Sequence, residues 1–388
     1  MAPAGSIDAA RPSRRVIQRI LIQIETIRVR IWRIGLVAGV VMVEITRRAF
    51  LMVAGGAGAA LLTGCKVIEN ETPAPAGGAS AASTVTAPAA SLPQTPTEIL
   101  ITPTGSLYTQ SYSSAPTVAS DDWRLRVHGL VTQERTLGLD DLRAFPKVES
   151  LRTLECIGNP VGGTLIGNVR WGGCEAAALW REVGILPQAT RAKFEAEDDY
   201  QTSVELKWIT QPGVLMVYEM NGEPLPTEHG FPLRILMPGL YGQKMPKWIR
   251  DIEFIDYDHQ GYWESRGWSD VASVQTNSIV RQPGDLDRLS AGSTPVFGVA
   301  FAGLRLITDV EVRIDDGDWT RARLLQDDSS LVWTQWSFEW AAAEGRHRIA
   351  VQATDETGFV QTTEGESILS SAYPDGTDNI HAVVVTVA

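Results

Sequence analysis

Apolar and polar residues alternate along several short segments between residues 108 and 280. The clearest case is Trp123–Leu130, where the alternation predicts a strand with one buried face. Two segments with helical spacing, Leu139–Phe145 and Glu175–Val183, are each followed by a proline or glycine that ends a helix. Strands are also predicted over 193–197, 200–206 and 248–257, and 231–238 is an apolar run. Short strands and helices joined by long connections predict an α+β domain over residues 108–280.

From residue 281 the pattern changes to strand-like segments separated by Gly, Asp and Asn turns. The segments are Val296–Phe301, Asp309–Ile314, Val332–Trp340, Arg346–Ala353 and Ala382–Val387. This spacing, with little helical pattern, predicts an all-β sandwich over residues 281–388. The stretch from Ile349 to Gln361, with a predicted hairpin turn at 355–358, resembles an edge of an immunoglobulin-like domain.

The first 64 residues have the features of an export leader. Thr46-Arg47-Arg48-Ala49-Phe50-Leu51 resembles a twin-arginine export motif, and a Gly- and Ala-rich apolar run follows it. The run ends at Leu62-Thr63-Gly64-Cys65, which resembles a lipobox. That resemblance implies a lipid anchor on Cys65 and a place on the extracytoplasmic face of the cell membrane. The alternative is a short transmembrane anchor with an incidental cysteine.

Two segments flank this leader motif. Residues 1–41 form either a basic amphipathic helix or an untranslated stretch, with Met42 as the true start. Residues 65–107 follow the predicted lipidation site, and 70–97 are almost entirely Ala, Pro, Thr, Ser and Gly. Such a composition buries too little apolar surface to offset its ordering entropy, so it predicts a disordered tether.

The charge of the chain excludes one class of partner. The formal net charge is −12, and residues 1–64 hold nine Arg against three acidic residues, which leaves −18 on the remainder. An acidic body is unsuited to nucleic acid. The three cysteines are too few for a disulfide framework.

One cysteine lies in a turn-rich loop, Glu155-Cys156-Ile157-Gly158-Asn159-Pro160. Glycine allows the backbone of such a loop to approach a large ligand closely, and a thiolate is a soft ligand for a thiophilic metal. Neither a Cys-x-x-Cys pair nor a His cluster is present, which argues against a zinc or iron–sulfur site made by protein alone. Cys156 can therefore hold a metal only where a cofactor supplies the other ligands.

A second segment, residues 220–248, forms a basic island in this acidic chain. Its cations are His229, Arg234, Lys244 and Lys247, interleaved with Gly and Pro. Arginine with helper cations, presented on loops, is typical of a phosphate site.

Together these two segments resemble the sulfite oxidase family of molybdopterin enzymes. Cys-x-Gly-Asn at 156–159 resembles the family's molybdenum-binding loop, and 221–248 resembles its pterin-binding region. The likeness implies a molybdenum–molybdopterin cofactor with Cys156 as the metal ligand. The residues that it implies for cofactor binding are Cys156, Asn159, His229, Arg234, Gly242, Lys244 and Lys247. It covers about 108–388 and implies that the sandwich domain forms a homodimer.

The chain departs from the sulfite-oxidising members of that family. Pro160 and Val161 replace two arginines after the cysteine loop, and 108–112 lacks the cation expected near the domain start. Trp268 falls where a tyrosine is expected, and we assign it and Arg266 to the catalytic pocket. These changes favour a small, weakly charged substrate over sulfite.

We therefore predict an oxidoreductase that exchanges an oxygen atom with such a substrate. Electrons pass to or from a separate protein, a cytochrome or a quinone-linked membrane subunit, because no haem motif is present. The alternatives are a sulfite-oxidising enzyme and a non-catalytic surface lipoprotein with an adhesive sandwich domain. Cys174 is interpreted as a packing residue, and the tryptophans at 319, 333, 336 and 340 as core or interface aromatics.

Overall fold

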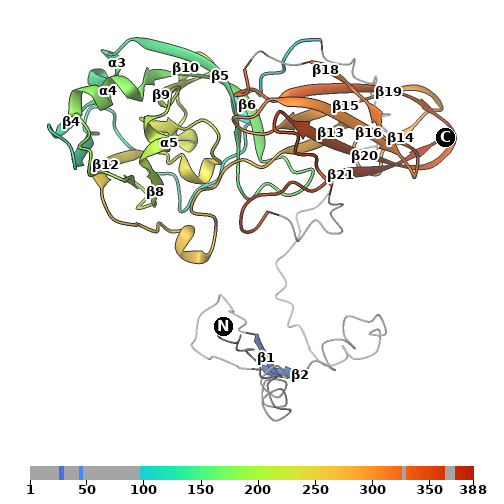
Figure 1. Ribbon diagram of the computed structural model, residues 1–388, viewed down its shortest axis with the longest axis horizontal. Helices are drawn as coiled ribbons and strands as arrows, with labels where there is room; N and C mark the ends of the chain where they lie inside the picture. Colours follow the sequence, from blue (N-terminus) through green and yellow to red (C-terminus); the bar gives the residue numbers. More distant parts are fainter. Residues whose placement is uncertain (1–25, 30–42, 47–96, 326–328, 363–371) are drawn as a thin grey trace, which may run out of the picture. The chain divides into compact units, whose positions relative to one another are not determined.

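The computed structural model describes residues 26–29, 43–46, 97–325, 329–362 and 372–388 (Figure 1). The chain divides into two units, Met1–Pro88 and Ala89–Ala388. In the first, β1 (Thr26–Val29) pairs antiparallel with β2 (Val43–Thr46). The four residues of β1 belong to the segment for which a basic helix was one alternative, and they are extended instead.

Most of the predicted leader lies outside the described residues. This applies to the twin arginines, the lipobox with Cys65, and the tether up to residue 96. Among the described residues, no helix combines the length and apolar character that a membrane span needs.

Two five-stranded sheets build the first half of the second unit. One has the order β10-β9-β6-β5, with β11 also paired to β9, and the other has the order β4-β3-β12-β7-β8. The strands of the first sheet are β5 (Lys147–Glu155), β6 (Ile166–Glu175), β9 (Leu215–Met220), β10 (Glu223–Pro224) and β11 (Arg234–Leu236). Those of the second are β3 (Leu125–Gly129), β4 (Arg135–Leu137), β7 (Arg191–Ala196), β8 (Gln201–Glu205) and β12 (Ile249–Ile255). Apolar residues from both sheets share one core.

The helices of this half are short. They are α3 (Leu139–Arg143), α4 (Ala176–Val183) and α5 (Leu206–Thr210), with 3-10 turns η1 (Thr104–Ser106), η2 (Thr227–His229), η3 (Gly242–Lys244) and η4 (Glu264–Arg266). The predicted helix over 175–183 is α4, which buries Leu179, Trp180 and Val183 on one face. It ends at Gly184, whose φ of 62° is readily adopted only by glycine.

The domain is mostly β, so the predicted α+β class holds only in part. β5, β6 and β9 are strands that the alternation pattern missed, and β6 and β9 are buried along nearly their whole length. A strand covered on both faces loses the polar–apolar alternation that identifies a strand with one exposed face. Cys174 lies in β6 and is 1% exposed within the core, which confirms its packing role.

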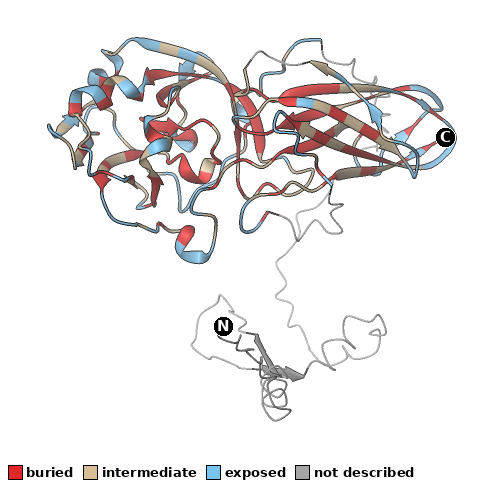
Figure 2. Ribbon diagram, in the orientation of Figure 1, coloured by how far each residue is buried: buried red, intermediate tan, exposed pale blue. Residues whose placement is uncertain are grey.

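Two further sheets form the C-terminal half. β13 (Asn277–Gln282), β15 (Gly292–Phe301), β19 (Thr334–Ala342) and β18 (Arg323–Leu325) make the first, in that order. β14 (Arg288–Leu289), β21 (His381–Val387), β20 (Gly345–Asp355), β16 (Ile307–Ile314) and β17 (Thr320–Arg321) make the second. Buried residues of both sheets pack together (Figure 2). The domain boundary expected at 280/281 falls inside β13. This strand pairs with β15, so it belongs to the C-terminal half from its first residue.

Tryptophans contribute to this C-terminal packing. Trp333, Trp336 and Trp340 are buried, as expected of core or interface aromatics. Trp319 is half-buried, and the Arg313 guanidinium lies 4.6 Å from the centre of its ring. The four side chains therefore do not form an exposed aromatic surface.

A shared apolar cluster joins the two halves. Ile157 of the cysteine loop and Tyr241 meet Val299, Phe301 and Trp333 from the C-terminal sheets. The segment before residue 110 also bridges the halves: Gln335 donates to the carbonyl of Glu98, and Asn221 donates to that of Thr102. The apolar cluster brings the C-terminal half close to the cysteine loop.

Candidate functional site

A pocket of about 260 Å³ opens in the first half of the unit. Six of the residues singled out from the sequence line it: Cys156, His229, Arg234, Gly242, Lys247 and Trp268. They are separated by up to 112 positions in the chain, so the fold has gathered them at one site.

The cysteine loop begins directly at the end of β5. The Cys156 N–H donates to the carbonyl of Leu165 at 2.9 Å, and the Asn159 N–H donates to the carbonyl of Cys156 at 2.9 Å. The Asn159 side chain donates to Glu155 and accepts from the Leu165 N–H, each at 2.9 Å. Asn159 is buried and does not line the pocket. Its role in this structure is to fix the loop that presents Cys156.

The thiol of Cys156 faces an open space. Burial raises the pKa of Cys156, opposed by the Gly158 N–H and reinforced by the neighbouring Glu155. A Cβ placed on Gly158 would lie 3.8 Å from both Cys156 Sγ and Trp268 Cη2. Glycine at this position therefore keeps the space between the thiol and the indole clear.

His229, Arg234 and Lys247 form a cation cluster in the same pocket. His229 ends η2, Arg234 begins β11, and an isolated β-bridge pairs Arg234 with Lys247. The Arg234 side chain is buried, donates to the His229 carbonyl at 3.2 Å and lies 5.0 Å from the Trp171 ring centre. Its Nε has no hydrogen-bond partner, although burying an unpaired polar atom costs about 1–3 kcal/mol.

The pKa values of this cluster move in the direction expected of crowded cations. Burial lowers the pKa of Arg234 to about 10, and burial followed by Arg234 lowers that of His229. Burial followed by Arg234 also lowers the pKa of Lys247 to about 7. Lys247 donates to Ser111 Oγ at 3.0 Å and to the Glu228 carbonyl at 2.8 Å. Within the described residues none of the three cations forms an ion pair with a carboxylate, although the charges of Asp198 and Glu228 act on Lys247, so the cluster suits an anionic ligand.

Lys244 and Arg266 lie elsewhere. Lys244 is fully buried in an ion pair with Glu264 and donates to the Ser203 carbonyl at 3.0 Å. Arg266 is exposed, and its guanidinium lies 3.5 Å from the centre of the Tyr262 ring. Neither lines the pocket. The sequence alone did not separate these two residues from the cation cluster. A lysine or arginine near glycine and proline looks the same in the sequence whether it forms a core ion pair or lines a ligand site.

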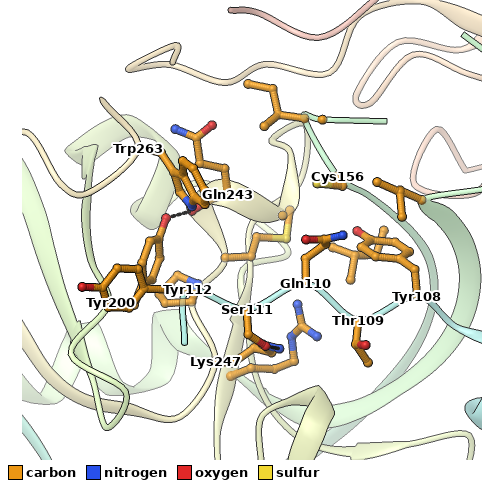
Figure 3. A pocket seen from close by; sticks show the side chains of 18 of the residues that line it. Tyr108, Thr109, Gln110, Ser111, Tyr112, Cys156, Tyr200, Gln243, Lys247 and Trp263 are labelled. Carbon is orange, nitrogen blue, oxygen red and sulfur yellow. Dashed lines mark hydrogen bonds between the residues drawn. The ribbon is translucent and has the colours of Figure 1, made fainter. Parts of the chain in front are cut away.

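Aromatic residues that the sequence pattern did not single out complete the pocket. Tyr108, Tyr112, Tyr200 and Trp263 line it together with Gln243. In Figure 3 the segment from Tyr108 to Tyr112 crosses the pocket from beside Cys156 to beside Tyr200. Tyr200 donates to the Gln243 carbonyl at 2.7 Å, and burial followed by Cys156 raises the pKa of Tyr108. In the sequence, residues 108–112 were notable only because they lack the cation that sulfite-oxidising members carry there.

Comparison with known proteins agrees with this geometry. Residues 112–263 match the family described as "Oxidoreductase molybdopterin binding domain". The uncharacterized oxidoreductase YuiH of Bacillus subtilis is 37% identical over 146 residues, which cover 38% of this chain and 72% of YuiH. The chain belongs to the sulfite oxidase family of molybdopterin-binding oxidoreductases. Its family membership confirms the resemblance inferred from the cysteine loop and the basic island.

Two other relatives extend the likeness beyond that region. Human mitochondrial sulfite oxidase is 28% identical over 319 residues, or 69% of this chain, which spans 58% of the length of that protein. The sulfane dehydrogenase SoxCD from Paracoccus pantotrophus superposes with a TM-score of 0.62 at 26% identity. That superposition covers 69% of this chain and 75% of the SoxCD chain, so the family fold includes both halves of the described unit.

The residues present fit the cofactor that the family implies, molybdenum carried by molybdopterin. Arg234 has a buried, unpartnered Nε, and the cations beside it form no ion pair with a carboxylate in the part of the chain that the structure describes. Both features match the phosphate of a pterin cofactor. Cys156 offers a sulfur ligand in the same pocket, and among the described residues no group of three or more His, Cys, Asp and Glu could hold a metal by itself.

Sulfate binding to the cofactor-free protein tests the charge of Lys247. The ammonium loses its proton as the pH rises through about 7, whereas sulfate keeps both charges over this range. We expect sulfate affinity to fall by roughly tenfold as the pH passes through this value, which is the contribution of one charge-assisted hydrogen bond. Isothermal titration calorimetry measures it. Lys247→Arg, which stays charged, should remove the pH dependence; an unchanged dependence would assign the titration to another group.

Proposed function

We propose that the chain is a molybdenum–molybdopterin-dependent oxidoreductase that exchanges an oxygen atom with a small, weakly charged substrate. The observation that carries this proposal is that Cys156 and the cation cluster of His229, Arg234 and Lys247 line one pocket. A soft sulfur ligand and an anion site are the two features that a metal on a phosphorylated pterin requires.

Each of these side chains has a separate task. When bound, the cofactor supplies further sulfur ligands and a two-electron couple for oxygen-atom exchange. Cys156 gives up its proton to act as a thiolate, and the buried loop around Asn159 fixes its direction. Arg234, with Lys247 and His229, holds the phosphate. Tyr108 and Tyr200 exclude water from the pocket between these two ends.

The substrate proposal rests on the walls near the thiol. Trp268 lines the pocket beside the thiol and Trp263 packs against it, and the cations that line the pocket belong to the cluster assigned to the phosphate. Pro160 and Val161 stand where sulfite-oxidising members carry arginine. A neutral oxygen donor or acceptor, such as a sulfoxide or a sulfane sulfur compound, suits aromatic walls better than an oxyanion does.

Sulfite oxidation is the alternative, supported by the names of the relatives. Assays with reduced viologen as donor, and with cytochrome or ferricyanide as acceptor, separate a reductase from an oxidase. In either direction we propose that electrons move to or from a separate redox protein, a cytochrome or a quinone-linked membrane subunit.

Metal and pterin contents of two variants test the assignment. We expect Cys156→Ser to keep the pterin and to lose most of the molybdenum, or to show an altered molybdenum spectrum. Arg234→Gln should lose the pterin, because the phosphate then lacks its buried cation. Elemental analysis with pterin release measures both. Arg126→Gln, on an exposed arginine of β3, is the matched control.

The result also decides between enzyme and adhesive lipoprotein. Well-folded wild-type protein from a pterin-competent host that carries neither metal nor pterin would sink the cofactor assignment. Binding activity that survives Cys156→Ser and Arg234→Gln unchanged would then favour a surface lipoprotein. The burial of Trp333, Trp336 and Trp340 supports the enzyme, because an adhesive aromatic face requires exposure.

We also propose that the two C-terminal sheets form an immunoglobulin-like sandwich that dimerises. The two sheets and their shared core support the sandwich, and the likeness to the family supports the dimer. Light scattering at micromolar concentration should give twice the mass of the mature chain. A single-chain mass that persists as the concentration is raised would contradict the dimer.

Finally, we propose export by the twin-arginine route and lipid anchoring at Cys65, on the extracytoplasmic face of the cell membrane. The order of twin arginines, apolar run and lipobox supports it. Mass spectrometry of the mature protein should find a diacylglyceryl-modified Cys65 as the first residue. Cys65→Ser should release the protein from membranes. An unmodified N-terminus at another position would contradict the anchor.

A further inference from the structure

A tyrosine from the C-terminal half reaches the wall of the pocket. Tyr373 packs edge-on against Trp268, with ring centres 5.2 Å apart and planes at 84°. Trp268 lines the pocket, whereas Tyr373 does not. The contact therefore links the pocket to a segment more than 100 residues away in the chain.

The backbone around both residues is shaped for this contact. Gly267 has a φ of 89°, and a Cβ there would lie 2.2 Å from the hydroxyl of Tyr373. The Ser269 N–H donates to the carbonyl of Pro374 at 3.1 Å. On the far side, a Cβ on Gly376 would lie 2.3 Å from the Tyr241 hydroxyl. Gly267 and one hydrogen bond thus seat the segment around Tyr373 against the loop that carries Trp268, and Gly376 seats it against Tyr241.

Trp268 is in turn next to the reactive end of the pocket. A single point, the position of a Cβ on Gly158, is 3.8 Å from both Trp268 Cη2 and Cys156 Sγ. On its other side Trp268 meets Trp263, with ring centres 6.3 Å apart at 78°. A shift of the Trp268 indole therefore changes the space beside the thiol.

Tyr373 contributes little to the hydrophobic core. It is 59% exposed, so its ring loses little contact with water on folding and contributes little stability by burial. Its hydroxyl has no hydrogen-bond partner among the described residues. The ring packs against Trp268. This contact points to a role in holding the Trp268 indole in position.

We propose that Tyr373 is a positioning residue of the substrate pocket, which holds Trp268 as the aromatic wall beside Cys156. The C-terminal half then completes the site, and the wall selects neutral substrates with apolar substituents. The selection of a substrate rests on the function proposed above, while the contact between Tyr373 and Trp268 does not.

Kinetics of the holoenzyme with a neutral probe test the proposal. Dimethyl sulfoxide is the probe and reduced methyl viologen the donor. The S–O bond breaks, two viologen radicals supply two electrons, two protons come from solvent, and dimethyl sulfide and water leave. Tyr373→Ala should raise KM by about three- to tenfold, the contribution of one edge-to-face aromatic pair, with kcat little changed. Tyr373→Phe should behave as wild type, and Phe359→Ala, at an exposed aromatic of the same half, is the matched control.

A double-variant cycle shows whether Tyr373 acts through Trp268. In a Trp268→Ala background, Tyr373→Ala should have no further effect on KM, because coupled residues are not additive. Full additivity of the two changes would overturn the proposal. Equal changes in KM and kcat in Phe359→Ala and in Tyr373→Ala would also overturn the proposal, because they would indicate a general effect on the C-terminal half.

A second readout does not depend on activity. The near-ultraviolet circular dichroism band lost in Trp268→Ala should also be lost in Tyr373→Ala, with Tm and molybdenum content unchanged. If wild-type holoenzyme does not reduce dimethyl sulfoxide, this spectrum alone tests whether Tyr373 holds Trp268 in position. An unchanged band in Tyr373→Ala overturns it. Absence of molybdenum from the wild type would instead count against the proposed function.

Discussion

The site depends on a cluster of buried and half-buried cations that form no ion pair with a carboxylate within the described residues. Arg234 is buried with an unpartnered Nε, and Lys247 and His229 share its surroundings. Burial lowers the pKa of all three, and the mutual repulsion of the charges lowers those of His229 and Lys247 further. Folding such a cluster costs free energy, and a bound anion would offset it. Under the proposed function that anion is the phosphate of a pterin, which would couple stability to cofactor binding at this site.

A second group of cations in the same half is paired with carboxylates of the protein itself. Lys244 is fully buried against Glu264, and Arg191 pairs with Asp270 at 2.8 Å. These charges are neutralised within the protein and need no ligand. Lys244 and Lys247 are three residues apart, yet one completes a core ion pair and the other faces the pocket. Lys244 is the last residue of η3, whereas Lys247 pairs with Arg234 in an isolated β-bridge, and of the two only Lys247 lines the pocket.

The same contrast explains how far the sequence predicted the molecule. Strands with one covered face, such as β3, β12 and β20, kept their alternation and were found, whereas β6 and β9 are covered on both faces and were missed. Cys156, His229, Arg234 and Lys247 were found because their spacing matches a family pattern. Arg266, Lys244 and Asn159 follow the same local pattern but lie outside the pocket lining. Tyr112, Trp263 and Tyr373 belong to separate segments, and only the fold brings their rings to one place.

The origin of the pocket walls has a consequence for assembly. One wall is the segment 108–112, another is the loop after β5, and a third is Trp268, which Tyr373 of the C-terminal half contacts. The lining segments are distant in the chain, so the pocket forms only once this half of the described unit has folded, and Tyr373 adds a contact from the C-terminal half. A cofactor enclosed by such walls stabilises the folded chain and enters before or during their closure. A protein built in this way gains from an export route that carries folded chains, which is the route proposed from the twin arginines at 47 and 48.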